Sequence, residues 1–492
     1  MSKTLDRDWL GGYPAVLTRA LATVTQRFAV PCYVAGGPVR DWLAGRACRD
    51  LDLTVGHGAV AFAAAMAREL GGTLVPLDTK EGVARVVWQG YELDFSDFRE
   101  GTTSIEADLA RRDFTINALA VAFDPETAGL GVPWRVIDPA GGIADLVARR
   151  IRVTHRHAFQ ADPLRLLRAY RFAAGLDFSL DGETEKLIAG QTALLAATAM
   201  ERIAYELDLV MASPRAAAVI AMMAANGLLW VPFPELRQGE GVAQPSSHHL
   251  DVFAHNHETL RCLEELLVDP GRRFPDHAAA MGVYLATGRR AVWLKWAALF
   301  HDLGKPACLR LRDGRITFYN HDREGGRLFA GIGRRLRWSR EAVRQVSRFI
   351  ELHMWPFHLN NANRKTRITP RACLRLVKAV GNELPGLFLL AMADSLAGEG
   401  PGKPAGMEEE LAALYDRVDR AWQQSIKPVL EQPRLLTGND LISRFGLASG
   451  PLLGRILAGL EAARVAGEVG DRQEAEAWVT TFLATHSAGK SH

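Results

Sequence analysis

Residues 36–55 read GGPVRDWLAGRACRDLDLTV, and the succession of residue types in this stretch decides the fold expected around it. The glycine pair, Gly36 and Gly37, follows the apolar run Cys32–Ala35, which predicts a strand entering a tight turn. Glycines at such a turn let backbone N–H groups approach a phosphate closely, and the helix expected next directs its positive end to the same place. Arg40 adds a guanidinium suited to phosphate oxygens. This half of the stretch therefore predicts a phosphate-binding turn.

The second half of the stretch, Asp50-Leu51-Asp52-Leu53, alternates acidic and apolar residues. Because alternate residues of a strand share a face, Asp50 and Asp52 are expected to point one way while the leucines face the core. Two carboxylates on one face repel each other unless a cation lies between them. A surface turn with two solvated aspartates is the alternative. The order strand, glycine pair, helix, strand favours a Mg²⁺ site beside a triphosphate, as in-line nucleotidyl transfer requires.

This order resembles the active-site motif of the class II nucleotidyltransferase superfamily, which contains tRNA CCA-adding enzymes and bacterial poly(A) polymerases. Three further strands are expected at 73–77, 83–89 and 91–95, and the last of them carries Asp94. The resemblance places a third catalytic acid at this kind of position and implies two Mg²⁺ ions. Asp97 is the competitor, but alternation puts it on the opposite face, so the pattern favours Asp94.

A second motif, RRDFTINALA, begins at Arg111. Asp113 precedes a short helix and Asn117 lies one turn further on, so both side chains are expected on the same side. Such a segment could be a capped surface helix. However, it resembles the family's second motif, in which arginine, aspartate and asparagine contact the ribose and phosphates of the incoming nucleotide. The resemblance assigns that role to Arg112, Asp113 and Asn117, with Arg111 adding further positive charge.

A helical segment follows, and its sequence ADPLRLLRAYRFAA places Asp162 and Arg165 three residues apart, as neighbours on one predicted helix face. An exposed intrahelical ion pair is the ordinary interpretation. The resemblance implies instead that the two side chains hydrogen-bond the Watson–Crick edge of the incoming base. Arg168 and Arg171 continue the same surface and are assigned to nucleotide binding. The glutamate that usually precedes the aspartate is replaced by Ala161.

Histidines and aspartates dominate the chemistry of the next part of the chain. His255, His301, Asp302 and Asp394 each lie in an apolar, helix-like segment. Imidazole and carboxylate groups suit divalent metals, and an adjacent His-Asp pair is costly to bury unless it is coordinated. The set resembles the HD metal-dependent phosphohydrolase superfamily, which implies Mn²⁺, Ni²⁺ or Co²⁺ at these four residues. A helical domain that has lost its metal is the alternative.

Three further histidines bear on this site. His257 competes with His255 as the first ligand, although the spacing favours His255. His321 and His353 stand where HD enzymes often keep histidines for substrate or for a second metal. Either of them alone would be an ordinary polar residue.

Length and composition bound the remaining possibilities. The chain has 492 residues, which is too long for a single hydrophobic core. Its net charge of +3 makes it only mildly basic. Its five cysteines form no C-x-x-C pair, and the first fourteen residues lack an apolar signal. The most apolar segment, near 291–300, is too short to span a bilayer. A cytoplasmic protein without a membrane partner is therefore expected.

The resemblance covers almost the whole chain and implies an α+β protein, with a small mixed-sheet head followed by an all-α body. We expect four domains: a catalytic head (1–150), a helical neck (151–240), an HD domain (241–400) and a C-terminal helical tRNA-binding domain (401–492). The implied activity is addition of CMP to the 3′ end of tRNA, with CTP and, for full CCA, ATP as substrates. The alternatives are a poly(A) polymerase and an HD phosphohydrolase with an inactive head.

The number of nucleotides added is expected to depend on a short segment. Only residues 100–107 separate Arg99 from Asp108, which leads into the second motif. Full CCA-adding members of the family usually carry a longer flexible loop here, and CC-adding members resemble this chain in having a short one. A short connection has little freedom to reposition between two base-recognition states. This favours CC addition, with a separate enzyme supplying the terminal A.

Overall fold

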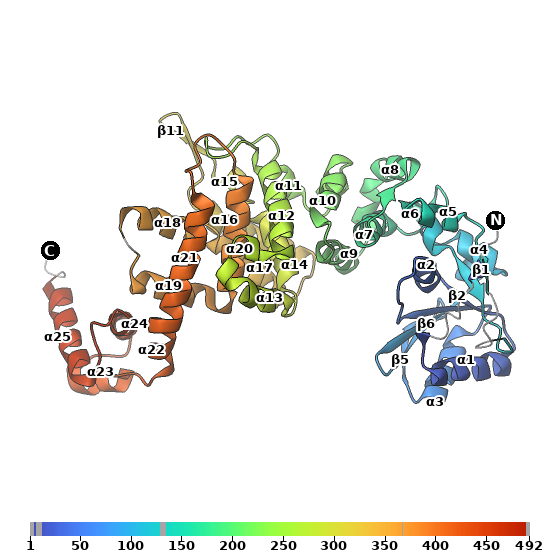
Figure 1. Cartoon of the computed structure of the whole chain (residues 1–492), viewed down its shortest axis with the longest axis horizontal. Coiled ribbons are helices and arrows are strands. Elements are labelled where there is room, and N and C mark those ends of the chain that lie inside the picture. Colours follow the sequence, from blue (N-terminus) through green and yellow to red (C-terminus); the bar gives the residue numbers. More distant parts are fainter. Residues whose placement is uncertain (1–3, 6–11, 128–133, 367, 489–492) are drawn as a thin grey trace. The chain divides into compact units, whose positions relative to one another are not determined.

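The computed structural model of the chain describes residues 4–5, 12–127, 134–366 and 368–488. They divide into two compact units (Figure 1). The first runs to residue 215 and also includes 219–232, and the second contains 216–218 and the residues from 233 onward. The α+β fold expected from the sequence is confirmed, since a mixed sheet occupies the first unit and helices dominate the second. The four-domain division stays a prediction.

The first unit is built on an eight-stranded mixed sheet with the order β1-β8-β7-β2-β3-β6-β5-β4. Most neighbouring strands are antiparallel, whereas β3 and β6 run parallel to each other. The strands are β1 (Thr4–Leu5), β2 (Cys32–Ala35), β3 (Leu51–Val55), β4 (Thr73–Asp78), β5 (Val83–Trp88), β6 (Tyr91–Asp97), β7 (Ala120–Ala122) and β8 (Trp134–Ile137).

The core of this sheet lies on the face away from the two aspartates. Leu51, Leu53 and Val55 are fully buried, as the alternation predicts. Two amphipathic helices, α1 (Ala15–Phe28) and α3 (Ala59–Leu70), pack against each other and supply the opposing side of the core. The sheet is therefore covered on its core face, which leaves the other face available to present polar side chains.

The remaining α-helices of the first unit and its boundary range from four to thirteen residues. The helix α2 begins at Gly37, where Pro38 stands in its first turn and suits a helix start. A two-stranded sheet joins β9 (Arg150–Ile151) and β10 (Ser179–Leu180). The helices are α2 (Gly37–Leu43), α4 (Ile105–Ala110), α5 (Gly142–Val147), α6 (Ala158–Ala161), α7 (Arg165–Leu176), α8 (Gly182–Ala189), α9 (Met200–Ala212) and α10 (Ala216–Ala225).

The second unit is helical apart from one small hairpin. Its helices pack around α12, α14 and α20, and a separate apolar cluster forms among the last three helices. The elements are α11 (Pro234–Arg237), α12 (Val252–Val268), α13 (Ala278–Ala286), α14 (Arg290–Phe300), α15 (Lys305–Cys308), β11 (Arg310–Arg312), β12 (Arg315–Thr317), α16 (His321–Arg335), α17 (Arg340–Leu352), α18 (Trp355–Lys365), α19 (Pro370–Val380), α20 (Leu384–Ala397), α21 (Met407–Ala421), α22 (Lys427–Glu431), α23 (Gly438–Phe445), α24 (Pro451–Val465) and α25 (Arg472–Ala488).

One stretch of the second unit is longer and more apolar than the sequence analysis expected. Pro370–Ala397, rather than the segment near 291–300, is long and apolar enough by composition to cross a membrane, with a mean hydropathy of 1.3. However, 67% of its apolar window is buried inside the protein, and α20 packs against α12 and α14. Burial among helices accounts for this composition, because a core helix is apolar on all sides. The five cysteines are all unpaired.

Candidate functional site

A cavity of about 630 Å³ in the first unit gathers every head and neck residue that the sequence analysis selected. These residues are separated by up to 135 positions in the chain, yet the fold brings all of them to one lining. They are Gly36, Gly37, Arg40, Asp50, Asp52, Asp94, Arg112, Asp113, Asn117, Asp162, Arg165, Arg168 and Arg171.

The glycine turn is built into this cavity by its backbone conformation. Gly36 has a φ of +83°, which L-residues rarely adopt, and a Cβ added there would lie 2.7 Å from an Nη atom of Arg112. Its N–H donates to the carbonyl of Leu119 on the way into β7. Arg40, one turn into α2, donates to the Oδ1 of Asn117 at 2.8 Å. The turn, the helix start and the second motif are thus held together as one surface.

The aspartates of β3 and β6 face each other across the parallel strand pair. Asp52 is directly in register with Asp94 on the neighbouring strand, about 4.8 Å away in the sheet. Burial, together with the negative charge of Asp94, raises the pKa of Asp52 to about 6. Asp97 points away and accepts a hydrogen bond from the N–H of Ala59 at 2.8 Å. The structure therefore places Asp94, and not Asp97, in the cavity.

This arrangement fits a divalent cation. Asp50, Asp52 and Asp94 all line the cavity, and burial together with the charge of Asp94 raises the pKa of Asp52, whose ionised form a bound cation would stabilise. Hard carboxylate oxygens gathered in this way are the ligands that Mg²⁺ prefers. The protein itself supplies one positive charge here, because Arg85 of β5 donates from Nε and Nη2 to the two oxygens of Asp94 at 2.6 and 2.8 Å. The sequence analysis did not select Arg85.

The second motif forms a hydrogen-bonded group. Asp113 accepts from the Nδ2 of Asn117 at 3.1 Å and from Arg168 at 2.6 Å. Although burial opposes ionisation, Arg168 and Asn117 hold the pKa of Asp113 well below its usual range. The prediction that Asp113 and Asn117 share a side is confirmed. Arg111 does not join them, because it pairs with Glu100 outside the cavity.

Asp162 and Arg165 do not share a helix face as predicted. The helix α6 ends before Asp162, whose backbone is extended with φ −146° and ψ 102°, and α7 begins at Arg165. The reason is Pro163, since a residue before proline is disfavoured in the helical region. Asp162 pairs with Arg202 at 3.3 Å, and Arg165 donates to the carbonyl of Arg111 at 3.0 Å. The alternative of an intrahelical ion pair is therefore wrong, and the two side chains are separate groups on the cavity wall.

Phe172 and Glu206 also belong to this wall and were missed in the sequence. The ring of Phe172 lies 4.2 Å below the guanidinium of Arg171 and 5.4 Å from that of Arg168. Glu206 of α9 is almost fully buried and pairs with Arg171 at 2.9 Å. Phe172 could have been selected from the sequence, because it lies two helical turns after Arg165 on α7 and therefore on a similar face. Glu206 gave no comparable signal, because its place depends on the packing of α9 against α7.

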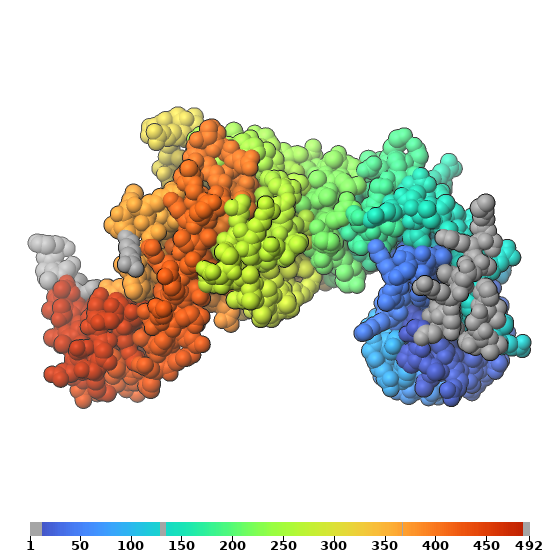
Figure 2. Space-filling view, viewed as in Figure 1, coloured from blue at the N-terminus to red at the C-terminus, as the bar shows by residue number. Residues whose placement is uncertain are grey.

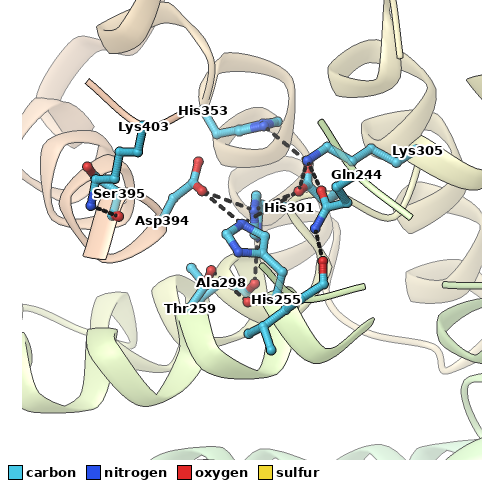
Figure 3. Close-up of polar contacts among 12 residues, drawn as sticks. Gln244, His255, Thr259, Ala298, His301, Lys305, His353, Asp394, Ser395 and Lys403 are labelled. Atoms are coloured by element: carbon cyan, nitrogen blue, oxygen red, sulfur yellow. Dashed lines mark hydrogen bonds and ion pairs between the residues drawn. The ribbon is translucent and has the colours of Figure 1, made fainter. Parts of the chain in front are cut away.

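A second cluster lies buried in the second unit. His255, His301 and Asp394 point toward one another (Figure 3), and their ligand atoms lie within 4.8 Å of each other. The Nε2 of His255 lies 3.0 Å from Asp394 Oδ1, and the Nε2 of His301 lies 3.2 Å from Asp302 Oδ2. Although burial opposes the ionisation of Asp302, Lys305 and His301 keep its pKa well below its usual value. All four residues selected from the sequence are thus together.

A second trio shares Asp302 with the first. The Oδ1 of Asp302 faces His321 at 3.3 Å and His353 at 3.7 Å, whereas its Oδ2 faces His255 and His301. The Nε2 atoms of His321 and His353 lie 3.3 Å apart. Asp302 therefore stands between two groups of ligand atoms.

The tautomers of three of these histidines are set by the backbone. The Nδ1 atoms of His301, His321 and His353 each lie 2.6–2.9 Å from the carbonyl oxygen three residues earlier. Because a carbonyl only accepts, each of these Nδ1 atoms carries a proton, and Nε2 is the ring nitrogen that faces the cluster. Burial, with His301 and His321 nearby, lowers the pKa of His353 to about 3. Imidazole rings that are oriented in this way and converge on a carboxylate fit divalent transition metals.

His257 is excluded from the cluster, since its Nε2 lies 2.8 Å from the carbonyl of Ala217. A cavity of about 550 Å³ opens over the cluster and is lined by Asp302, His321 and Asp394. Lys305, which the sequence analysis did not select, reaches Asp302 at 2.5 Å and the Oε1 of Gln244 at 2.6 Å.

Two segments match known protein families. Residues 32–152 match the family described as "Poly A polymerase head domain", and residues 177–239 match "Probable RNA and SrmB- binding site of polymerase A". These segments contain most of the first cavity's lining.

Relatives match nearly the full length of the chain. An "A-adding tRNA nucleotidyltransferase" of Deinococcus radiodurans is 36% identical, over 91% of this chain and 94% of that protein. A "CC-adding tRNA nucleotidyltransferase" of Thermus thermophilus is 32% identical, over 93% and 95%. A solved CCA-adding enzyme in complex with CTP has the same fold, with a TM-score of 0.66 at 23% identity over 98% of this chain and 99% of that one.

Proposed function

This chain belongs to the family of tRNA nucleotidyltransferases and bacterial poly(A) polymerases, and on that premise we propose that it adds CMP from CTP to the 3′ end of tRNA. The observation that carries the proposal is the single cavity that all thirteen selected residues line. In this reaction the 3′-hydroxyl of the RNA gives up its proton to solvent as its oxygen forms a bond to the α-phosphorus of the nucleotide, and the bond from that phosphorus to the pyrophosphate oxygen breaks. Two bound Mg²⁺ ions, held by Asp50, Asp52 and Asp94, would stabilise the negative charge that develops there.

The other residues of the cavity bind and orient the nucleotide. The start of α2 at Gly37 and the guanidinium of Arg40 are suited to the phosphates, and the Asp113–Asn117 pair is suited to the ribose hydroxyls. Seven arginines and seven carboxylates line the cavity, so the protein groups are nearly neutral as a set. The charge of a triphosphate is then balanced by the two divalent cations, which makes nucleotide binding depend on the metal.

Asp162 is proposed to read the incoming base together with Arg165. A carboxylate and a guanidinium on one wall can pair with the edge of cytosine and leave guanine or uracil with unmatched groups. We expect Asp162→Ala to reduce the preference for CTP over UTP about tenfold or more, with a smaller change in triphosphate affinity. Single-nucleotide incorporation with each NTP measures this preference. Glu183→Ala, an exposed change on α8, serves as the control, and an unaltered preference in Asp162→Ala would return Asp162 to a structural role.

The product is proposed to end at CC. Hydrogen bonds between the two residues that flank 100–107 hold the ends of this segment together. The buried Asp108 accepts from the N–H of Arg99 at 2.9 Å and from its guanidinium at 3.0 Å. Glu100 pairs with Arg111 across the same segment. A segment tied at both ends has little freedom to change the base that the site accepts. Purified protein given tRNA lacking CCA, with CTP and ATP together, is expected to stop after two cytidines.

Addition of the terminal adenosine is the second candidate. It is favoured by the 36% identity to a relative named A-adding, and the same assay separates the two when a tRNA that already ends in CC is included. Incorporation of AMP onto that substrate, or a CCA product from the first, would contradict the CC proposal. A long adenosine tail would instead identify a poly(A) polymerase. If the product is CC, a separate A-adding enzyme is required, and a cytoplasmic location is proposed for both.

The second unit is proposed to be a phosphohydrolase that acts on phosphate or cyclic phosphate groups of RNA ends or nucleotides. The support is the buried set of imidazoles whose Nε2 atoms face Asp302 beneath a cavity. Bound Mn²⁺, Ni²⁺ or Co²⁺ would activate water for attack on phosphorus. The oxygen of water forms a bond to phosphorus, one ester P–O bond breaks, and the released oxygen takes up a proton. Lys305 is positioned to neutralise charge beside Asp302.

A further inference from the structure

The hairpin β11–β12 lies in the chain between two residues of the histidine–aspartate cluster, Asp302 and His321. It projects from the helices of the second unit (Figure 1), and Figure 2 shows it as the yellow protrusion on the surface of that unit. Its strands are three residues each, and its side chains are exposed or half-buried. Such a small element contributes little to the core, so its sequence is free to serve another role.

One face of this hairpin is positively charged. Arg310 is opposite Thr317, and Arg312 is directly opposite Arg315, so the three arginines lie on the same face. Like charges placed directly opposite in an antiparallel pair destabilise it. Within the described ranges of the chain, none of the three guanidiniums lies within ion-pair distance of a carboxylate. An anionic partner from outside would relieve this repulsion.

Several other basic residues of the second unit do have carboxylate partners. The sequence has many arginines and lysines between 334 and 378, but several of them are matched within the protein. Examples are Arg335 with Glu235, Arg364 with Glu410, Arg371 with Glu468 and Lys378 with Glu461. The hairpin arginines differ from these four residues, because they have no carboxylate partner among the described residues and lie together on one face.

The hairpin leads directly into the cavity above the metal cluster. Thr317, Phe318 and Tyr319, the residues that end β12 and follow it, line that cavity. The side chain of Tyr319 is 67% exposed and stacks with the guanidinium of Arg312 at 5.3 Å. An exposed aromatic ring beside arginines is suited to stack a nucleobase while the guanidiniums contact phosphates.

We propose that the β11–β12 hairpin binds the single-stranded 3′ end of an RNA and guides its terminal phosphate into the phosphohydrolase cavity. The proposal deepens the phosphohydrolase function and rests on it, since it selects RNA ends over free nucleotides as substrates. Arg310, Arg312 and Arg315 bind phosphates of the preceding nucleotides, and Tyr319 stacks a base at the cavity mouth. A mononucleotide would reach the cluster without touching the arginines.

The test compares two substrates on the full-length protein with Mn²⁺ or Ni²⁺: a twelve-nucleotide RNA and cytidine monophosphate, both with a 2′,3′-cyclic phosphate. For R310A/R312A/R315A, KM for the RNA is expected to rise about tenfold with kcat unchanged, while both constants for the mononucleotide stay the same. The slope of log KM against log salt for the RNA should fall by about 2, because each lost phosphate contact contributes about 0.7. R310K/R312K/R315K, which keeps the charge, should restore most of the affinity.

The matched control is R19A/R27A/R68A, which removes the same charge from exposed positions on α1 and α3. Equal losses in both triple variants, or equal effects on RNA and mononucleotide, would overturn the proposal. If poly-L-glutamate binds the hairpin and RNA does not, the partner is an acidic protein instead. This outcome would overturn the proposal as well.

A second measurement separates this proposal from the hydrolase activity itself. RNA with 4-thiouridine at its penultimate position is expected to crosslink to the peptide that contains Tyr319, and the crosslink should disappear in R310A/R312A/R315A. If the wild-type protein hydrolyses no substrate yet forms this crosslink, the phosphohydrolase function fails while RNA binding by the hairpin stands. Hydrolysis of RNA without the crosslink overturns the role of the hairpin and leaves the hydrolase in place.

Discussion

Replacement of Asp52 by asparagine is expected to abolish nucleotide addition, with a loss of at least about 10³-fold in kcat. The substitution keeps the size of the side chain and removes the charge that faces Asp94 across the β3–β6 pair. A neutral amide is a poor ligand for Mg²⁺ compared with a carboxylate, and the site would lose charge where the phosphates need balancing. Incorporation of labelled CMP into tRNA, in a single turnover, measures the effect.

The matched control is Asp97→Asn, on the same sheet but facing the other way. Asp97 accepts its hydrogen bond through Oδ1, which an asparagine can also do, so activity is expected to stay within about twofold of the wild type. Metal-dependent hydrolysis by the second unit should be unchanged in both variants. Normal incorporation by Asp52→Asn would show that the proposed metal ligands are wrongly assigned.

The strand and helix pattern of the head could be predicted because its signals are local. The alternation around Asp52 is enough to orient its side chain, and the strand predicted over 91–95 is found at that place. The preference for Asp94 over Asp97 followed from the same period of two, and the structure places the two side chains accordingly. Local periodicity is reliable where one face of the strand is buried.

The errors arose where a neighbouring residue or a distant contact decides the geometry. Asp162 was assigned to a helix although Pro163 follows it, and the restriction that proline imposes ends α6 there. Arg85 and Glu206 could not be selected from the sequence, because they matter only through strand pairing with Asp94 and helix packing beside Arg171. The sharing of Asp302 between two histidine groups likewise depends on five segments meeting in space.

In the second unit, Asp302→Asn is expected to remove metal binding from both histidine groups. Its two oxygens face different partners, Oδ2 toward His301 and Oδ1 toward His321, so the carboxylate is shared. We expect the wild-type protein to bind two Mn²⁺ or Ni²⁺ ions per chain, and the variant to bind none at micromolar concentrations. Elemental analysis after gel filtration and titration calorimetry measure the stoichiometry without reference to activity.

A graded series makes this prediction specific to the shared carboxylate. His353→Ala removes a ligand of the second group only, so one ion per chain should remain, whereas Asp302→Asn should lose both. His358→Ala serves as the matched control, because its exposed side chain lines the same cavity but belongs to neither group. Nucleotide addition should be preserved in all three variants, since its residues lie in the first unit. Two ions retained by Asp302→Asn would show that Asp302 is not a ligand, and an equal loss in His353→Ala would show that the two groups form one site.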